Sequence, residues 1–454
     1  MPSSILDDRR ASISAGEIAK DSGTQPGRTM RCGTQSVSGS VSQRACVYCG
    51  ARVVLNPVTD AFHLVHGPIG CAAYTRDIRG SLSSGSELYR NSFSTDLDER
   101  DIVFGGTEKL SRAVDEIVAN YHPPLIFIYS TCIVGVIGDD VEAVCRKAEA
   151  KHSIRVINVQ APGFAGNKSV GYRLAGEALM KLISPHYTGR KVKAVNILGD
   201  YNLAGEIWII KNYFQQIGID VLSVFTGDSS YQTLIKAPSA SLNIVQCAGS
   251  MVNLAAKMEE SFGIPWVTAS FFGTDDTSSA LLRAAELMGD EKARNKAKIL
   301  VTAEKAKTEA ALTEYLPGLK GKKAAVFVGG GFKAVSLVRQ FNALGMETVL
   351  VGTQTGSAED YEVLGGLVGP KAVILDDANP AELEAFMESR GADILVGGVK
   401  ERPLAYKMGI AFCDHNHERR HPLAGFVGVE NFTREIHRSI NSPVWAQARA
   451  QCPF

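Results

Sequence analysis

Short runs of apolar, often β-branched residues recur along most of the chain, and each is followed by a segment with helical spacing of its apolar positions. Runs that are apolar throughout are typical of parallel strands covered on both faces. Strands that alternate with helices in this way indicate an α/β protein. The pattern predicts ten strands, at 124–130, 154–160, 193–199, 220–227, 242–247, 323–330, 346–352, 372–377, 392–398 and 410–414.

The segment GDDVEAVCRKAEAK shows how the intervening helices are marked. Two acidic residues stand near its start and basic residues gather toward its end, as the helix dipole favours. Val141, Val144, Cys145 and Ala148 follow the i, i+3, i+4, i+7 spacing of one helix face. We therefore expect Cys145 in the core and not at a metal site.

Two breaks divide this series of strands and helices. A polar stretch with a proline, 184–193, precedes a new strand, and YLPGLKGKK, 315–323, follows a long charged helix. Because domains usually have roughly 100–200 residues, 454 residues suggest about three. The first 45 residues are rich in Ser, Gly, Thr and Arg without apolar periodicity, which predicts an irregular arm. We expect this arm at 1–45 and three doubly wound, Rossmann-like or flavodoxin-like parallel-sheet domains at 46–187, 188–319 and 320–454.

Composition and charge narrow the functional classes. Hydrophobic residues make up 45% and charged residues 21%, as is ordinary for a globular protein. Lys and Arg total 48, as do Asp and Glu, so no general attraction to nucleic acid or anionic membrane follows. No apolar run reaches the roughly 18–20 residues of a membrane span, and the start lacks a signal-peptide core. We expect a cytoplasmic protein that binds neither nucleic acid nor membrane.

The chain has nine cysteines. In the cytosol thiols stay reduced, and an odd count is poor support for a disulfide framework. Some of them are therefore expected to bind metal. They are Cys32, Cys46, Cys49, Cys71, Cys132, Cys145, Cys247, Cys413 and Cys452.

The stretch CVYCGARVVLNPVTDAFHLVHGPIGC first suggests a zinc finger, because Cys46 and Cys49 are followed by His63 and His66. The gap of two residues between the histidines is shorter than the roughly three to five of that motif. The alternative is a pair of histidines packed near a turn. The Gly-Pro-Gly turn in HGPIGC would then hold Cys71 in a fixed direction, which suits a ligand.

Two further cysteines follow predicted parallel strands. Cys132 lies just beyond the strand at 124–130, and Cys247 ends the strand at 242–247. Ligands bind at this edge of open α/β sheets, although a single cysteine there is more often buried and inert. Three cysteines in such settings, counting Cys71, favour metal binding. Thiolates without a matching set of histidines suit an iron–sulfur cluster, whose ligands here would come from distant segments or from a second chain.

Two glycine-rich loops, VGGGFKAVS and VGGVKERPL, also follow predicted strands. Neither is a dinucleotide fingerprint or a P-loop, so nucleotide binding is weakly supported. Backbone amides at a helix start, together with Lys333 or Lys400, would suit an anion such as a polycarboxylate. The alternative is a pair of tight turns in a doubly wound domain.

Four stretches resemble the nitrogenase component 1 family: VHGPIGCAAYTRDIRG, STCIVGVIGDDVEAVC, VGGVKERPLAYKMGI and INSPVWAQA. The resemblance runs from about Cys46 to the C-terminus and implies the fold of that family. NILGDYNLAGEIW, GFAGNKSVGYRLAGEA and FCDHNHERR look most like the α-type subunit of the scaffold that matures the iron–molybdenum cofactor for nitrogen fixation. This implies a biosynthetic scaffold without independent turnover. The alternative is an enzyme, the catalytic dinitrogenase α subunit or a related reductase of the family.

The resemblance also implies metal ligands. The three cluster cysteines of the family fall on Cys46, Cys71 and Cys132, which would hold a [4Fe–4S] cluster whose fourth thiolate comes from a partner subunit. Cys247 matches the cysteine that binds the large cofactor or its all-iron precursor. Cys49 is not a ligand position in the family pattern.

The chain departs from the catalytic type at two places. Asn416 stands where catalytic α subunits have a histidine ligand, although His415 and His417 flank it. Lys168 and Tyr172 stand in the segment where the catalytic type has a glutamine and a histidine. Both departures favour a site that holds the cofactor in transit over a site at which substrate is turned over.

The resemblance implies transient contacts and partners as well. Lys400 matches the contact to homocitrate, and Lys333 stands where catalytic subunits have an arginine. A NifN-type β subunit would complete an α2β2 heterotetramer, and NifB would donate the iron–sulfur precursor. The iron protein NifH would dock transiently and supply reducing equivalents while molybdenum and homocitrate are inserted.

Overall fold

The chain forms two compact units in a computed structural model that describes residues 12–14, 45–76, 82–85, 87–416, 418–445 and 447. One unit holds Ala45–Ala269 and Arg283–Lys296. The other holds Ser270–Leu282 and Ala297–Phe454, together with a short N-terminal strand. Helices α13 (Thr274–Leu287) and α14 (Glu291–Leu312) contribute residues to both units.

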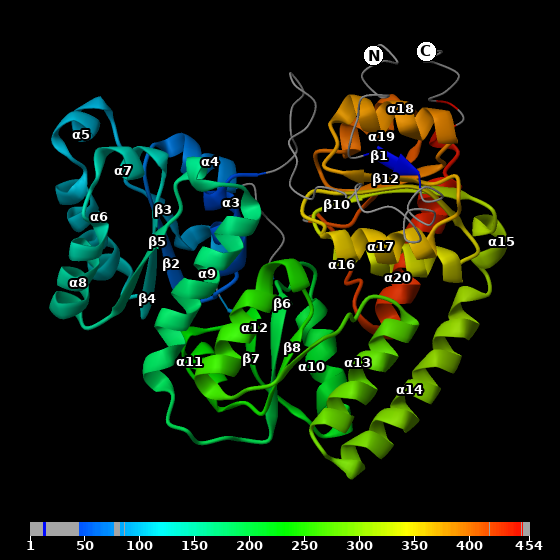
Figure 1. Ribbon diagram of the computed structural model, residues 1–454, viewed down its shortest axis with the longest axis horizontal. Helices are drawn as coiled ribbons and strands as arrows, with labels where there is room; N and C mark the ends of the chain where they lie inside the picture. The colour runs from blue at the N-terminus through cyan, green and yellow to red at the C-terminus, as the bar shows by residue number, and fades with distance from the viewer. Residues whose placement is uncertain are drawn as a thin grey trace, which may run out of the picture. The chain divides into compact units, whose positions relative to one another are not determined.

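The unit that begins at Ala45 contains two parallel sheets. The first has the order β3 (Ser92–Ser94), β2 (Ala61–His66), β4 (Leu125–Ser130) and β5 (Arg155–Gln160). Phe127 and Tyr129 of β4 face one core and Ile126 and Ile128 face another, so the strand is buried on both sides. One face is covered by α3 (Val47–Leu55) and α9 (Lys168–Ile183), and the other by α6 (Thr107–Tyr121) and α8 (Val141–His152) (Figure 1). The shorter helices are α4 (Ile69–Arg76), α5 (Glu99–Phe104) and α7 (Cys132–Ile137).

The second sheet of this unit repeats the same strand order. Its strands are β7 (Asp220–Thr226), β6 (Ala194–Asp200), β8 (Leu242–Val245) and β9 (Trp266–Thr268), all parallel. Its helices are α10 (Glu206–Ile217), α11 (Tyr231–Leu234) and α12 (Ala248–Phe262).

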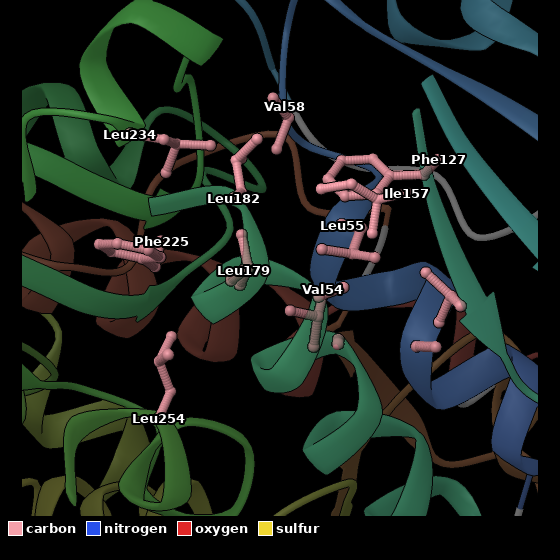
Figure 2. Packing of buried hydrophobic residues seen from close by; sticks show 14 of the residues in the cluster. Val54, Leu55, Val58, Phe127, Ile157, Leu179, Leu182, Phe225, Leu234 and Leu254 are labelled. Atoms are coloured by element: carbon pink, nitrogen blue, oxygen red, sulfur yellow. The ribbon is translucent and has the colours of Figure 1, made fainter. Parts of the chain in front are cut away.

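One hydrophobic core joins these two sheets. Figure 2 shows Leu179 and Leu182 of α9 within it, with Val54 of α3, Phe225 of β7 and Leu254 of α12. All five side chains are buried at 1% exposure or less, and each contributes about 1.5–3 kcal/mol relative to an exposed position. The two sheets therefore share one core within this unit.

The other unit is built on a sheet with the order β12 (Val373–Asp376), β11 (Glu347–Thr353), β10 (Lys323–Val328), β13 (Ile394–Gly397) and β14 (Ala411–Asp414). These strands are parallel, and their order is the 3-2-1-4-5 of a Rossmann-type sheet. One face carries α16 (Gly331–Ala343), α17 (Ala358–Leu367) and α20 (Gly425–Ile440), and the other carries α18 (Pro380–Arg390) and α19 (Arg402–Lys407) (Figure 1). A short helix, α15 (Leu316–Leu319), precedes β10.

The predicted fold class is confirmed, and all ten expected strands are present, with β1, β2, β3 and β9 in addition. Cys145 is buried in α8 at 3% exposure, as its spacing predicted. Within the expected N-terminal arm, β1 (Ser12–Ser14) pairs antiparallel with β12; Cys32 and the rest of residues 1–44 lie outside the described residues. The domain bounds remain predictions. Among the described helices, none is long and apolar enough to cross a bilayer.

Candidate metal-binding sites

Predicted site residues follow the two strands at which the strand order reverses in each sheet. Cys71 follows β2 and Cys132 follows β4 in the first sheet, while Cys247 follows β8, the neighbour of β6, in the second. Lys333 and Lys400 follow β10 and β13 in the third. Open α/β sheets bind ligands at this topological switch point, because the connections on either side diverge and leave a crevice.

Three thiols are grouped at the switch point of the first sheet. Cys46 is the N-cap of α3, Cys71 lies in α4, and Cys132 begins α7. The backbone N–H of Gly163 donates a hydrogen bond to Sγ of Cys132 at 3.0 Å. A Cβ at position 163 would lie 3.0 Å from Sγ of Cys132 and 3.7 Å from Sγ of Cys46, so only a glycine leaves the space between these thiols open.

Cys71 completes this group of thiols. Burial raises the pKa of its thiol, and the charges of Cys132 and Cys46 raise it further, while a hydrogen bond with the Thr131 side chain opposes both. Three neighbouring thiolates repel one another, so a cationic metal centre would stabilise them. Across the described ranges, no three His, Cys, Asp or Glu side chains surround a single point as one metal ion requires.

The zinc-finger alternative is wrong, because the side chains of both histidines are buried in the protein interior and pack there. His63 and His66 are buried at 1% and 0% exposure, and burial lowers the pKa of each ring. Nδ1 of His63 lies 2.9 Å from the hydroxyl of Tyr129. They are histidines packed near the turn, which was the alternative that the sequence offered.

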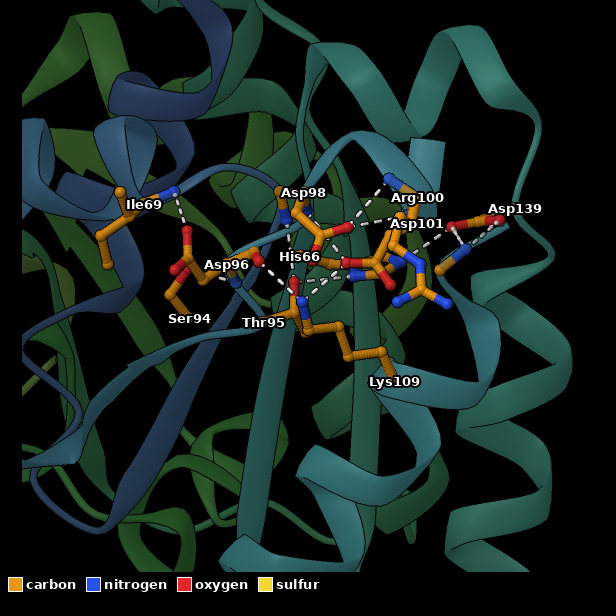
Figure 3. A network of polar contacts seen from close by, with 12 residues as sticks. His66, Ile69, Ser94, Thr95, Asp96, Asp98, Arg100, Asp101, Lys109 and Asp139 are labelled. Atoms are coloured by element: carbon orange, nitrogen blue, oxygen red, sulfur yellow. Dashed lines mark hydrogen bonds and ion pairs between the residues drawn. The ribbon is translucent and has the colours of Figure 1, made fainter. Parts of the chain in front are cut away.

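His66, the last residue of β2, links the two segments that lead into the helices of Cys71 and Cys132. Its Nε2 lies 3.0 Å from Oδ2 of Asp139 and its Nδ1 lies 3.1 Å from Oγ1 of Thr95 (Figure 3). The carbonyl oxygen of His66 accepts hydrogen bonds from both the N–H and the hydroxyl of Thr131, at 3.2 and 3.0 Å. Asp139 also accepts from the N–H of Gly106. This network fixes the end of β2 to the start of α7, and no sequence motif had indicated it.

Cys247 has a separate polar surrounding in the same unit. It is the half-buried N-cap of α12, and a Cβ at Gly199, whose φ is +89°, would lie 2.6 Å from Cβ of Cys247. The hydroxyl of Tyr201 donates to Oγ of Ser250 at 2.7 Å, one turn into that helix. The Tyr172 phenol, with smaller contributions from Cys49 and Cys247, raises the pKa of Lys168 against the effect of burial. A cationic side chain thus accompanies the single thiol.

In the other unit, Lys333 and His415 lie together. Nζ of Lys333 donates to the carbonyl oxygen of His415 at 3.2 Å and lies 5.5 Å from the ring centre of Phe272. The His415 ring is fully buried against Phe272 and Phe432, and burial holds its pKa well below the usual value. Neither ring nitrogen has a hydrogen-bond partner among the residues that the structure describes. His417 lies outside the described residues.

Lys400 and Asn416 meet at Glu401. The N–H of Gly398 donates to Oε2 of Glu401 at 2.8 Å, and a Cβ at Gly398 would lie 2.5 Å from Nδ2 of Asn416. Burial raises the pKa of Glu401 to about 7, against the lowering effect of its hydrogen bonds from the backbone and the smaller lowering effect of the Lys400 charge. The structure therefore gathers an ammonium, an amide and a carboxyl at this switch point.

Glu401 should make stability depend on pH. Because the folded-state pKa is about 7 and the usual value is 4.5, protonation of Glu401 favours the folded state below the usual value, and this contribution is lost as pH rises toward 7. Glu401→Gln keeps an acceptor for the N–H of Gly398 and has no carboxyl group to ionise. The variant should therefore not lose stability as pH rises. We expect the variant to gain up to about 3 kcal/mol over the wild type between about pH 5 and pH 8. Thermal melting across that range measures the difference; Glu388→Gln, at an exposed position, is the control. Parallel pH profiles of Glu401→Gln and the wild type would contradict the assignment.

Known proteins are similar to this chain in sequence and in fold. The family of nitrogenase component 1 type oxidoreductases matches residues 46–441. The nitrogenase iron-molybdenum cofactor biosynthesis protein NifE of Clostridium pasteurianum is 62% identical, over 97% of this chain and 96% of its own. NifE of Methanosarcina barkeri is 52% identical, over 92% and 93%. A solved structure of nitrogenase Cp1 at pH 5 is 29% identical, with a TM-score of 0.87 over 98% of this chain and 97% of its own. The chain therefore belongs to the nitrogenase component 1 type oxidoreductase family, in the group of NifE proteins.

Proposed function

We propose that the chain is the α-type subunit of a scaffold on which the iron–molybdenum cofactor is matured for nitrogen fixation. The observation that carries this proposal is the division of thiols in one unit: three are grouped at one switch point, and one stands alone at another. The group suits a permanent cluster, and the single thiol suits a substrate cluster that must leave. The NifE relatives are named for biosynthesis of this cofactor.

Cys46, Cys71 and Cys132 would hold the permanent [4Fe–4S] cluster. The residues fit such a group, because the donors are soft thiolates and the Gly163 backbone leaves room between them. A [4Fe–4S] cluster usually has four thiolate ligands, so the fourth would come from the partner, a NifN-type β subunit in an α2β2 assembly. Exposed apolar side chains near the thiols, Ile69 at 57%, Val136 at 72% and Phe164 at 65%, support a protein interface there.

Gly163→Ala should disturb this cluster without unfolding the chain. The new Cβ would lie 3.0 Å from Sγ of Cys132 and 3.3 Å from Cβ of Cys46, so the thiol must move by a few tenths of an ångström. We expect the assembled complex to lose most of its cluster absorbance while its melting temperature stays close to that of the wild type. Gly366→Ala, where nothing lies within 4 Å of the new Cβ, is the matched control. A full cluster in Gly163→Ala would mean that the thiols are not placed as described.

Cys247 would hold the iron–sulfur precursor as a substrate. One strong ligand leaves few bonds to break on release, whereas Lys168 adds an electrostatic attraction that holds an anionic cluster without a covalent bond. Tyr172 lies beside that ammonium, with Nζ 5.8 Å from its ring centre. These groups would retain the precursor and still allow its transfer.

The basic and polar groups of the other unit would receive homocitrate and molybdenum. Ammonium groups attract carboxylates, so Lys400 and Lys333 suit an organic polyacid. Asn416 offers an amide, which is not a strong metal ligand. The ring nitrogens of His415 have no hydrogen-bond partner among the described residues, so they would bind a polar ligand if the ring turned outward. The role of His417 remains a prediction on a residue outside the described part.

Two further partners complete the proposal. NifB would donate the precursor, and NifH would dock transiently to supply reducing equivalents. Such exchanges require that this chain bind its substrate cluster reversibly, as a single thiolate allows.

Purification with and without the β partner tests the shared cluster. We expect the chain coproduced with a NifN-type subunit to carry a [4Fe–4S] absorption and electron paramagnetic resonance signature, and the chain alone to lose it. An equally stable cluster in the chain alone would contradict the bridging role. The catalytic alternative predicts substrate reduction by the purified complex.

A further inference from the structure

Arg52 of α3 is a buried cation with no role in the sites described so far. Its side chain is only 3% exposed, which is rare for an arginine unless a carboxylate pairs with it. Nη2 of Arg52 donates a hydrogen bond to Oγ of Ser92 in β3, whereas Nε and Nη1 have no hydrogen-bond partner among the residues that the structure describes. Because a buried charge without a counter-charge is costly, another group is needed to stabilise this guanidinium.

Aromatic rings with polar atoms pack beside the guanidinium. Cζ of Arg52 lies 5.3 Å from the ring centre of Tyr129, close enough for a cation–π contact. The Tyr129 ring packs in turn against Tyr48, at 5.7 Å between ring centres, and against His63, at 5.9 Å. Burial raises the pKa of Tyr48 to about 12, raises that of Tyr129 as well, and lowers that of His63. These three side chains are therefore neutral near pH 7 and do not offset the charge of Arg52.

The rings beside Arg52 belong to segments that carry two of the grouped thiols. Tyr48 lies two residues after Cys46 in the chain, and Tyr129 lies three residues before Cys132. Arg52 itself is six residues after Cys46, which is about 9 Å along a helix that rises 1.5 Å per residue. The guanidinium is thus packed among residues that adjoin two of the three thiols.

A hydrogen bond connects the third thiol to the same rings. The hydroxyl of Tyr48 lies 2.7 Å from Oγ1 of Thr75, which follows Cys71 by one turn in α4. The Thr75 hydroxyl also donates to the carbonyl oxygen of Cys71, at 3.4 Å. All three segments that carry the grouped thiols therefore meet at the residues that pack around Arg52.

We propose that Arg52 raises the reduction potential of the [4Fe–4S] cluster and so favours its reduced state. This inference rests on the proposed function. A cluster with four thiolate ligands is anionic, and one added electron makes it more so, so a nearby cation stabilises the reduced state more than the oxidised one. Water screens a buried charge little, so the effect extends beyond direct contact. The cluster would in turn supply the negative charge that offsets the burial of Arg52.

Four forms of the complex with the β partner test this effect: the wild type, Arg52→Met, which removes the charge, Arg52→Lys, which keeps it, and Lys147→Met as the control. Lys147 is exposed on α8, which covers the opposite face of the first sheet, so water screens its charge. Each complex is titrated with dithionite and redox mediators, and the reduced cluster is measured by electron paramagnetic resonance. At a given potential, we expect the ratio of reduced to oxidised cluster in Arg52→Met to fall about tenfold, which is about 59 mV for one electron. Arg52→Lys and Lys147→Met should stay close to the wild type.

The potential of Arg52→Met separates this inference from the proposed function. A wild-type potential in Arg52→Met, with the cluster intact, would overturn the inference and leave the proposed function standing. A wild-type complex without a [4Fe–4S] signal would contradict the proposed function, and the inference with it.

A second neutral variant covers the case in which Arg52→Met assembles no cluster. Arg52→Gln keeps an N–H donor for Ser92 and is titrated in its place, with the same fall expected. A cluster that only Arg52→Lys retains, at the wild-type potential, would also support the inference, because charge is what the two neutral variants lack. Loss of the cluster in all three variants would show that Arg52 acts through packing, and would overturn the inference.

Discussion

Cys247→Ala removes most of the precursor iron from the assembled complex and leaves the permanent cluster intact. The thiol is the N-cap of α12 at the switch point of the second sheet, well separated in sequence from the three grouped cysteines. Alanine keeps the backbone and deletes the one strong ligand, so only electrostatic attraction and any second donor remain. We expect at least about a tenfold fall in retained precursor, measured as iron per complex and by its spectra.

The control for this prediction must remove a thiol without touching the site. Cys145→Ala does so, because Cys145 is packed in the core between α8 and the first sheet. Equal precursor iron in the two variants would show that Cys247 does not bind it. Loss of the permanent cluster in Cys247→Ala would show instead that the two sites are not independent.

Cys132→Ala affects the other cluster. It abolishes the permanent cluster, which Cys247→Ala leaves intact. Cys132 is the exposed member of the three thiols and accepts the hydrogen bond from Gly163. In this variant the chain supplies two thiolates in place of three, so a cluster that bridges the two subunits lacks one ligand. Because the cluster would join the subunits, its loss weakens their contact. We expect loss of the [4Fe–4S] signal and easier dissociation of the heterotetramer, measured by size-exclusion chromatography at decreasing concentration.

The same substitution at Cys71 or Cys46 should act alike, because the three thiols form one group. A cluster that survived in any one of the three variants would exclude that residue as a ligand. Cys145→Ala is again the matched control.

The sheets were largely predictable from apolar runs, and the reasons are local. Strand β4 is apolar along its length because both of its faces are covered, so its pattern is unambiguous. Strand β2 was not predicted, since AFHLVH carries two histidines that are buried only because Tyr129, Thr95 and Asp139 bond them. Strand β1 depends on the free edge of β12 for its pairing, which no local pattern reveals.

The candidate sites were predictable in part for a similar reason. Cysteines that follow parallel strands must lie at the carboxyl edge of a sheet, which is how Cys132 and Cys247 were selected. Gly163 and Thr131 belong to the same site, yet nothing in their sequence setting distinguishes them from ordinary loop residues. The close contact of the α3 and α9 backbones at Gly50 and Gly171 was likewise not predictable, because the two glycines are 121 positions apart in the chain.

Transfer of a finished cofactor tests the central claim most directly. The purified complex, loaded with precursor, is given molybdate, homocitrate, NifH and ATP, then mixed with dinitrogenase that lacks its cofactor. The proposed scaffold predicts that the complex gains molybdenum, activates the dinitrogenase and reduces no substrate at a comparable rate by itself. Substrate reduction by the complex alone, with no activation of the cofactor-free dinitrogenase, would contradict it.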